Sequence, residues 1–312
     1  MKKQTTMDLD HQRLYLLSFD RHADLAGMFH LSAPLSPEQR EAVIDRKRVI
    51  YDGFQKALGR GLHVGAAGIL VDEEFGAGIL RDAAANGYAT ALPTEQSGSD
   101  EFDFEYGAFA KHIEAFRPTF AKALVRYDPD GDAAVNQRQL ARLRTLSDYC
   151  RAAGQRFLLE LFVSATRAEQ TRAGNDRTIG DAGPRVAAML EAIHRLRSVG
   201  VEPDVWEVEG LDRREDCERI VDIVRRDGRD EVGCIVAACG ADEARVARWL
   251  ETAASVSGFI GFAVGRTAFR GALSAYAARQ ITRDEAASLV ARRFRERVAT
   301  FEHAHRSHAS AA

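Results

Sequence analysis

The stretch FAKALVRYD (residues 120–128), followed by VNQRQLARLRTLSDYCRAA (135–153), contains one repeating unit of the fold. The first segment is short and mostly apolar, which is typical of a buried β-strand. In the second segment Leu140, Leu143, Leu146 and Cys150 recur at three- and four-residue spacing, and arginines occupy the other side. This period predicts an amphipathic helix that packs its apolar side on the strand.

The same alternation of strand and helix patterns runs through most of the chain. The segments that resemble strands are Leu14–Asp20, Val64–Asp72, Ala89–Glu95, Phe120–Asp128, Arg156–Val163, Val205–Gly210, Gly233–Gly240 and Gly258–Arg266. The segments that resemble helices are Pro37–Lys56, Phe75–Asn86, Phe104–Phe116, Val135–Ala153, Pro184–Val199, Arg213–Asp227, Ala241–Ala254 and Arg283–His303. Strands that alternate with helices form either a closed barrel or an open doubly wound sheet. No GxGxxG motif follows the first strand, and the count of eight favours a (β/α)8 TIM barrel.

Nothing in the composition divides the chain. It has 312 residues, with no linker rich in Pro, Gly or Ser and no shift in composition. This length is somewhat above the roughly 250 residues of a typical TIM barrel and is ample for one core. We therefore expect a single TIM-barrel domain over residues 1–312, with its core at about 14–303 and a flexible tail at 304–312.

Charge and hydropathy exclude several classes of partner. The net charge is −3, so the chain lacks the basic surface that nucleic acids require. No apolar run reaches the roughly 18 residues of a membrane span, and the N-terminus has no apolar signal-peptide segment. The four cysteines lack the CxxC spacing of a zinc site. These features predict a cytoplasmic protein with reduced thiols and no nucleic-acid or membrane partner.

Polar residues gather where the predicted strands end. In TIM barrels the catalytic groups lie at the C-terminal ends of the strands and in the loops that follow them. We expect catalytic roles for Asp20, Lys122, Glu160 and Glu207, and substrate contacts from Asp72, Arg126 and Glu209. A charge within an apolar strand needs a partner or an active role, because an unpaired buried ion costs several kcal/mol. A buried ion pair of Lys122 with Glu160 or Glu207 is the purely structural alternative.

The loop after the last predicted strand is a candidate phosphate site. TIM barrels often bind phosphate with the loops after strands seven and eight, through backbone N–H groups and a nearby helix N-terminus. Gly240 and Gly265 allow a close approach of the backbone, and Arg266 has a guanidinium that grips phosphate with two N–H groups. These three residues are therefore the expected phosphate-binding set.

Several long segments resemble one family of aldolase-like domains. They are GILVDEEFG (68–76), FDFEYG (102–107), FAKALVRYDPDGD (120–132), VEPDVWEVEGLD (201–212) and GFIGFAVGRTAF (258–269). The family is the domain fused to 5-dehydro-2-deoxygluconokinase in bacterial inositol catabolism, of the 2-deoxy-5-keto-gluconate-6-phosphate aldolase type. It is more distantly similar to tagatose-bisphosphate aldolase. The resemblance implies a TIM barrel, a phosphorylated keto-sugar or sugar acid as substrate, Schiff-base chemistry and no metal cofactor. It also permits a homo-oligomer.

Two departures from the family pattern remove lysines. Glu207 stands where the family segment VWKIEGLD has the lysine that aligns with the Schiff-base lysine of tagatose-bisphosphate aldolase. Gln96 replaces a second lysine, in the family motif EKSG. Lys122 matches the strand-four lysine of the family and is the remaining candidate amine. The other matching site residues are Asp72, Arg126, Glu160, Glu209, Gly265 and Arg266.

Three interpretations remain open. In the first, Lys122 forms the imine, as in transaldolases, whose reactive lysine also lies on strand four. A neighbouring Glu207 would stabilise the protonated amine, which works against formation of the neutral, nucleophilic amine. In the second, carboxylates bind a divalent cation in a metal-assisted lyase or isomerase; its candidate ligands are Asp72, Glu160, Glu207 and Glu209. In the third, the chain is a catalytically silent relative that binds a sugar phosphate or pairs with an active homologue.

Overall fold

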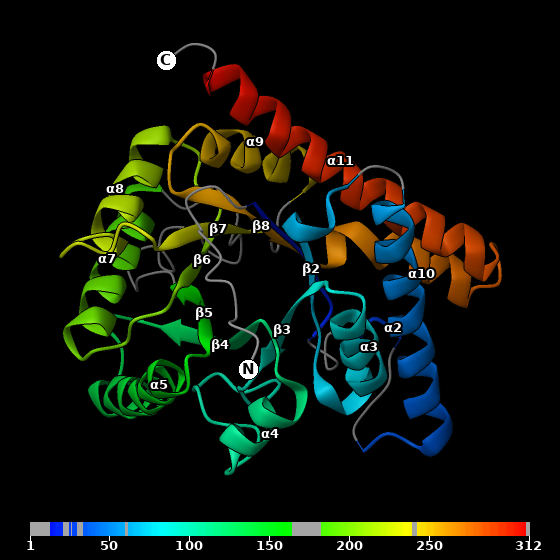
Figure 1. The fold of residues 1–312 in the computed structure, drawn as a ribbon, viewed down its shortest axis with the longest axis horizontal. Helices are drawn as coiled ribbons and strands as arrows, with labels where there is room; N and C mark the ends of the chain where they lie inside the picture. Colours follow the sequence, from blue (N-terminus) through cyan, green and yellow to red (C-terminus); the bar gives the residue numbers. More distant parts are fainter. Residues whose placement is uncertain are drawn as a thin grey trace.

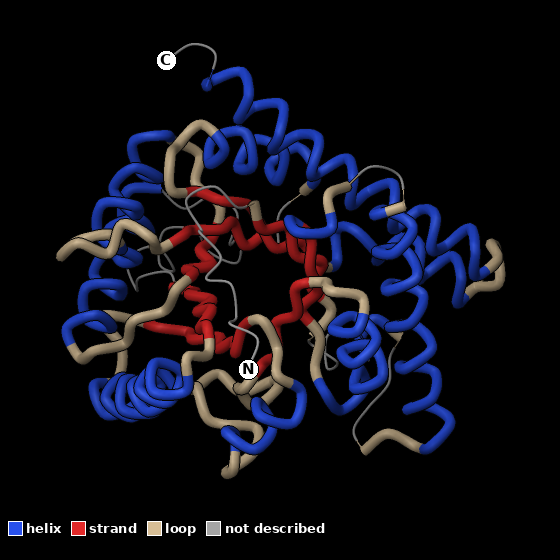
Figure 2. Tube along the Cα trace, in the orientation of Figure 1, coloured by secondary structure: helices blue, strands red, loops and turns tan. Residues whose placement is uncertain are grey.

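Eight parallel strands form a closed barrel in the computed structural model, which describes residues 13–20, 25, 27–29, 34–59, 62–163, 182–238 and 242–309. The strands are β1 (Leu14–Ser18), β2 (Ala67–Leu70), β3 (Ala89–Pro93), β4 (Phe120–Tyr127), β5 (Arg156–Val163), β6 (Val205–Glu209), β7 (Gly233–Ala238) and β8 (Phe259–Val264). Each strand pairs with its sequence neighbours, and β8 returns to pair with β1. Figure 2 shows the strands as a closed ring. The predicted TIM barrel is confirmed.

The helices surround this ring (Figure 1). They are α2 (Pro37–Leu58), α3 (Glu73–Ala85), α4 (Phe109–Phe116), α5 (Ala133–Ala153), α7 (Ala182–Ser198), α8 (Arg214–Val224), α9 (Glu243–Ala254), α10 (Arg266–Ala277) and α11 (Arg283–Ala309), with a short 3-10 helix η1 (Val64–Ala66) before β2. The long α11 crosses the outside of α9, α10 and α2. None of the helices in the described ranges is long and apolar enough to cross a membrane.

Local sequence explains where several helices begin. The carboxylates of Asp72, Asp132 and Asp242 accept backbone N–H bonds in the first turns of α3, α5 and α9. Ser36 caps α2 in the same way and forms a capping box with Gln39. Each cap satisfies N–H groups that have no partner within the helix. Because Asp72 closely follows β2, its cap fixes the turn from barrel to helix at the mouth.

Two apolar cores lie on either side of the barrel wall. The inner core contains Leu14, Leu16, Leu70, Ala91, Phe120, Leu158, Val205, Ile235, Ile260 and Ala263. The outer core packs the opposite faces of the strands against the helices and includes the fully buried Trp206. This division follows from strand alternation, which sends successive side chains to opposite faces. Lys122 and Glu207 alternate with outer-core residues, so they point into the barrel.

The structure differs from the sequence-based expectation in four elements. The first part of the predicted strand Val64–Asp72 is the 3-10 helix η1. Helix α4 begins at Phe109 rather than Phe104, because residues 95–108 form a loop whose Glu95 bridges Phe104. Helix α10 was not predicted. Where a flexible tail was expected from residue 304, α11 continues to Ala309, and the buried Ala304 packs on the outer core.

Candidate functional site

Lys122 lies at the centre of a buried charge cluster inside the barrel. Its Nζ is 2.6 Å from Oε1 of Glu95, 2.7 Å from Oε2 of Glu160 and 3.3 Å from Oδ2 of Asp20. The lysine side chain is fully buried, and the three carboxylates are at most 12% exposed. The predicted ion pair of Lys122 with Glu160 is therefore present as part of a larger cluster.

Four neighbouring strands bring these groups together. Lys122 and Glu160 lie within β4 and β5, while Asp20 and Glu95 lie two residues beyond the ends of β1 and β3. The Ser18 hydroxyl donates to Oδ1 of Asp20 at 2.9 Å and orients that carboxylate. The backbone N–H of Thr94 donates to Oε2 of Glu95 at 3.2 Å, which leaves Oε1 for the ammonium. Glu95 was visible at the end of a predicted strand, but it was not expected in the site.

The cluster contains more carboxylates than the lysine can neutralise. Burial raises the pKa of Glu95, and repulsion from Asp20 adds to the effect against the attraction of Lys122. Glu95 therefore takes up a proton at a higher pH than an ordinary glutamate. A carboxyl group that exchanges a proton beside a buried amine is suited to general acid–base catalysis.

Glu207 and Glu209 extend the acidic side of the barrel interior. Glu207 is buried and is the register partner of Glu160 in the β5–β6 pair. Glu209 lies at the end of β6, and burial raises its pKa against the attraction of Arg185 and Arg126. Arg185 donates to the carbonyl of Gly210 at 3.1 Å and had no signal in the sequence. Glu207 thus lies in the barrel interior, and Glu209 lies at the C-terminal end of β6.

Lys47 supports the mouth from outside the barrel. This lysine of α2 is fully buried and donates to the carbonyl of Phe19 at 2.8 Å and that of Asp20 at 3.4 Å. It also forms an ion pair with Asp72. Asp72 in turn accepts the Phe75 N–H at 2.8 Å as the cap of α3. Asp72, expected to contact substrate, is therefore held by Lys47 and the cap, although it also lines the cavity.

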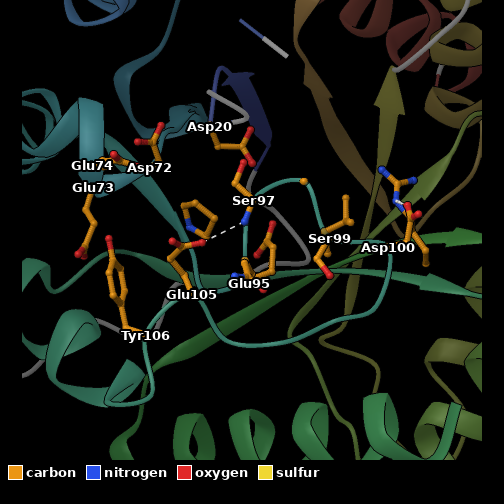
Figure 3. Close-up of a pocket in the computed structure, with 15 residues that line it drawn as sticks. Asp20, Asp72, Glu73, Glu74, Glu95, Ser97, Ser99, Asp100, Glu105 and Tyr106 are labelled. Carbon is orange, nitrogen blue, oxygen red and sulfur yellow. Dashed lines mark hydrogen bonds and ion pairs between the residues drawn. The ribbon is translucent and has the colours of Figure 1, made fainter. Parts of the chain in front are cut away.

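A cavity of about 120 Å³ opens at this end of the barrel. Its walls include Asp20 and Glu95, which are two of the three carboxylates of the Lys122 cluster. Arg126 lies on the same wall, with its Nε 3.7 Å from Oδ1 of Asp100. The cavity thus brings together three of the expected site residues, Asp20, Asp72 and Arg126. Figure 3 shows the side chains that surround it.

The loop between β3 and α4 forms much of the cavity wall. It contributes Gln96, Ser97, Gly98, Ser99, Asp100, Glu105 and Tyr106. The loop folds back on itself, because the N–H of Gln96 bonds to the carbonyl of Asp103 and that of Ser97 bonds to Glu105. Figure 3 marks the bond between Ser97 and Glu105. This wall was not part of the expected site.

Another part of the cavity wall contains Glu73, whose carboxylate is held in place by His112. Its Oε1 is 2.6 Å from Nδ1 of His112, and the rings of His112 and Tyr106 stack with centroids 3.9 Å apart. Burial, together with the nearby Glu73 carboxylate, raises the pKa of Tyr106 to about 12. Figure 3 shows the Glu73 carboxylate pointing toward the Tyr106 hydroxyl.

The expected phosphate site lies at the start of α10. Gly265 is the N-cap of this helix, and Arg266, its first residue, is exposed. No side chain caps the helix, so its first N–H groups point to the region beyond β8. Gly240 lies outside the described residues, and its place in this site stays a prediction.

The carboxylates of the cluster converge on an ammonium rather than on a metal position. In the part of the chain that the structure describes, no three His, Cys, Asp or Glu side chains form a group that could hold a metal ion. The ligand set expected for a divalent cation included Asp72, whose carboxylate is bound to Lys47.

A family model matches residues 1–305 of the chain, and its description is an uncharacterized protein conserved in bacteria (DUF2090). A comparison with curated proteins finds no match. Similar folds occur in many solved structures, of which three serve as examples. Fructose-bisphosphate aldolase from Plasmodium falciparum has a TM-score of 0.65 at 12% identity, over 94% of this chain and 92% of that one.

The other two are similar over nearly the whole chain. Cgl0159 from Corynebacterium glutamicum has a TM-score of 0.57 at 17% identity, over 90% of this chain and 85% of that one. An archaeal fructose 1,6-bisphosphate aldolase has a TM-score of 0.56 at 12% identity, over 92% of this chain and 93% of that one. At these identities the likeness establishes a shared aldolase-like barrel.

Proposed function

The chain belongs to the DUF2090 family and folds as an aldolase-like TIM barrel, and from this premise we propose that it is a carbon–carbon lyase. Its substrate would be a phosphorylated keto-sugar or sugar acid, cleaved through an imine on Lys122. The observation that carries the proposal is the position of the Lys122 amine directly behind Glu95 and Asp20, two of the carboxylates that line the cavity. Among the described residues Lys122 is the one lysine on a barrel strand.

Glu95 supplies the proton transfer that this chemistry needs. The ammonium of Lys122 gives a proton to the Glu95 carboxylate, 2.6 Å away, and becomes a neutral nucleophile. The raised pKa of Glu95 favours this transfer, which turns an ion pair into two neutral groups. A swing of the Glu95 side chain exposes the amine to a carbonyl carbon in the cavity.

The remaining steps use the same groups. The amine adds to the substrate carbonyl, and protonated Glu95 returns its proton to the departing hydroxyl, which leaves as water. Asp20 then takes the proton of the hydroxyl on the second carbon from the imine carbon. The bond between that carbon and its neighbour next to the imine breaks, and its electrons form an enamine. Protonation of the enamine carbon and addition of water then release the second product and the free amine.

The proposed phosphate-binding site is the start of α10. Exposed helix N–H groups and a guanidinium together favour a phosphate dianion. Gly265 and Arg266 lie at the end of β8, on the same mouth as the cavity beside β2 and β3. A sugar phosphate would therefore extend across the mouth, with its carbonyl over the Lys122 cluster.

Borohydride trapping tests the proposal. Dihydroxyacetone phosphate is incubated with the protein and borohydride, and the adduct is located by intact mass and peptide mapping. We expect one adduct, on Lys122, that Lys122→Met abolishes. Lys111→Met removes an exposed lysine of α4 and should leave the adduct unchanged.

The outcomes separate the interpretations. An adduct on another lysine, or full turnover in Lys122→Met, would contradict an imine on Lys122. Calorimetric binding of sugar phosphates with neither an adduct nor turnover would identify a silent binding protein. The catalytic proposal would then be wrong, while the proposed phosphate site would remain.

A further inference from the structure

We infer that Lys47 is a positioning residue, which acts on the reacting groups through Asp20. The lysine holds the backbone of Asp20 and so fixes the carboxylate of that residue against the Lys122 ammonium. The inference rests on the proposed function, in which Lys122 forms the imine and Asp20 accepts the proton of the substrate hydroxyl. It gives a role in the reaction to a residue of α2 that is not among the described residues lining the cavity.

The burial of Lys47 sets it apart from most basic residues of the chain. Only six of the 43 lysine and arginine residues are lysines, and two of the four lysines that the structure describes, Lys47 and Lys122, are fully buried. A buried ammonium loses its hydration, and well-packed apolar side chains often replace a buried ion pair without loss of stability. Stability alone therefore does not account for a charge at position 47.

The contacts of Lys47 concern the backbone of Asp20. Its Nζ lies 2.8 Å from the carbonyl oxygen of Phe19 and 3.4 Å from that of Asp20. These oxygens belong to the peptide groups before and after the Cα of Asp20, which is two residues beyond the end of β1. Both residues are buried, and a buried carbonyl needs a donor. Lys47 supplies one, so α2 fixes the backbone from which the Asp20 carboxylate extends.

The carboxylate of Asp20 depends on that backbone position for its distance to the amine. Its Oδ1 accepts the Ser18 hydroxyl at 2.9 Å, and its Oδ2 is 3.3 Å from Nζ of Lys122. The second distance is just beyond the usual range of an N–H···O bond, so a small outward shift of the backbone removes the contact. Ser18 thus orients the carboxylate, and Lys47 holds it within reach of Lys122.

The third contact of Lys47 fixes the lysine itself. It forms an ion pair with Oδ2 of Asp72, while Oδ1 of Asp72 accepts the N–H of Phe75 at 2.8 Å and caps α3. The ammonium therefore joins the end of β1 to the start of α3. The Asp20 backbone cannot move relative to α3 unless its contact with Lys47 breaks.

Reductive methylation of Lys122 tests the inference without a sugar phosphate. Formaldehyde and cyanoborohydride methylate neutral amines, and peptide mapping by mass spectrometry gives the rate at each lysine. If Lys47→Met releases Asp20, the Lys122 amine loses a neighbouring carboxylate and is neutral more often. We expect its methylation at neutral pH to become about tenfold faster, with the pH profile of the rate shifted to lower pH.

The direction of this change separates positioning from simple loss of charge. A nearby cation disfavours the Lys122 ammonium, so loss of the Lys47 charge by itself should make the methylation of Lys122 slower. A slower or unchanged rate in Lys47→Met would overturn the inference. Lys47→Gln keeps an amide that can donate to a carbonyl, so it should give a smaller increase. This variant also provides the test if Lys47→Met does not fold.

A double-mutant cycle shows whether Lys47 acts through Asp20. Asp20→Asn should speed the methylation of Lys122, and Lys47→Met should add nothing in that background. Additive effects would indicate a general loosening of the barrel and would overturn the inference. Exposed Lys111 is the internal standard of each sample. Arg48→Met, which removes an exposed charge from the next position of α2, is the matched control and should leave the Lys122 rate unchanged.

A failure of the proposed function is distinguishable from a failure of the inference, because methylation requires no substrate. If dihydroxyacetone phosphate is not trapped on Lys122 but the cycle is non-additive, the imine proposal is wrong and the positioning of Asp20 by Lys47 is supported. If the adduct forms on Lys122 but the effects add, the proposed function stands and the inference is overturned.

Discussion

Glu160 and Glu207 lie directly opposite each other in the register of the β5–β6 pair. Register partners on adjacent strands point to the same face, so both carboxylates enter the barrel, and each is 2% exposed. Position 207, where the resembled family has a lysine, thus holds a second buried carboxylate beside that of Glu160. The Lys122 ammonium, 2.7 Å from Glu160, is the positive charge that this interior depends on.

Replacement of Glu207 by glutamine should stabilise the protein. Register partners on adjacent strands lie about 5 Å apart, and two carboxylates at that separation would, if both are charged, repel each other by about 3 kcal/mol at an effective dielectric constant of 20. Because the substitution also removes an attraction to the Lys122 ammonium, we expect the free energy of unfolding at neutral pH to rise by only about 1 kcal/mol. Urea unfolding measures it, with exposed Glu231→Gln at the far end of β7 as the control. A loss of stability would show that Glu207 is a net attractive partner in the cluster.

Glu95 should make stability depend on pH. Its pKa in the folded protein is raised by burial and by Asp20, so the folded state binds this proton more tightly than the unfolded chain does. The contribution is therefore fully present below the usual glutamate pKa and is lost as pH rises through the raised value. The glutamine of Glu95→Gln stays neutral. Between pH 5 and pH 8 we therefore expect the free energy of unfolding of this variant to fall by about 1 kcal/mol less than that of wild type. Parallel pH profiles would contradict a raised pKa.

The sequence predicted the barrel because each strand and helix has its own local period. Apolar runs of strand length alternate with helix-period segments such as Ala133–Ala153, and these signals require no knowledge of distant contacts. Helix α10 was not predicted from the sequence, because Gly265 supplies no side-chain cap and the helix follows β8 without a loop. The late start of α4 has a similar cause, since the backbone bonds of residues 95–108 join positions that no periodic pattern links.

The candidate site was predictable only in part. Lys122 and Glu160 were expected inside the barrel, since a charge in an apolar strand demands a partner. The contact of Lys122 with Glu95 depends on the path of the chain beyond β3, which the strand pattern does not specify. The contact of Lys47 with Asp72 joins a helix to the end of a strand. Nothing in the sequence distinguishes Lys47 from an exposed lysine on a helix surface, so this contact could not be predicted.

Arg266 should contribute to phosphate affinity. If the start of α10 binds the phosphate, Arg266→Ala should weaken fructose 6-phosphate binding at least about tenfold, because charged hydrogen bonds to phosphate contribute about 1.5–3 kcal/mol. Calorimetry measures the change. Arg270→Ala, an exposed arginine about one turn further along α10, tests whether positive charge alone is sufficient. Similar losses in both variants would indicate attraction by net charge, and no loss in either would place the phosphate elsewhere.

Closure of the barrel should depend on Gly261. This residue of β8 is the register partner of Leu14 in β1, and a Cβ built on it would lie 1.9 Å from the Leu14 carbonyl oxygen. The clash is with backbone, which cannot rotate away, so Gly261→Ala must separate the strands that complete the ring. We expect a loss of at least about 3 kcal/mol in the free energy of unfolding, or failure to fold. Gly271→Ala, on α10 with open space around the added carbon, should stabilise slightly or have no effect. Urea unfolding of the two variants compares the positions, and a mild effect at Gly261 would show that β1 and β8 tolerate a wider spacing than this register implies.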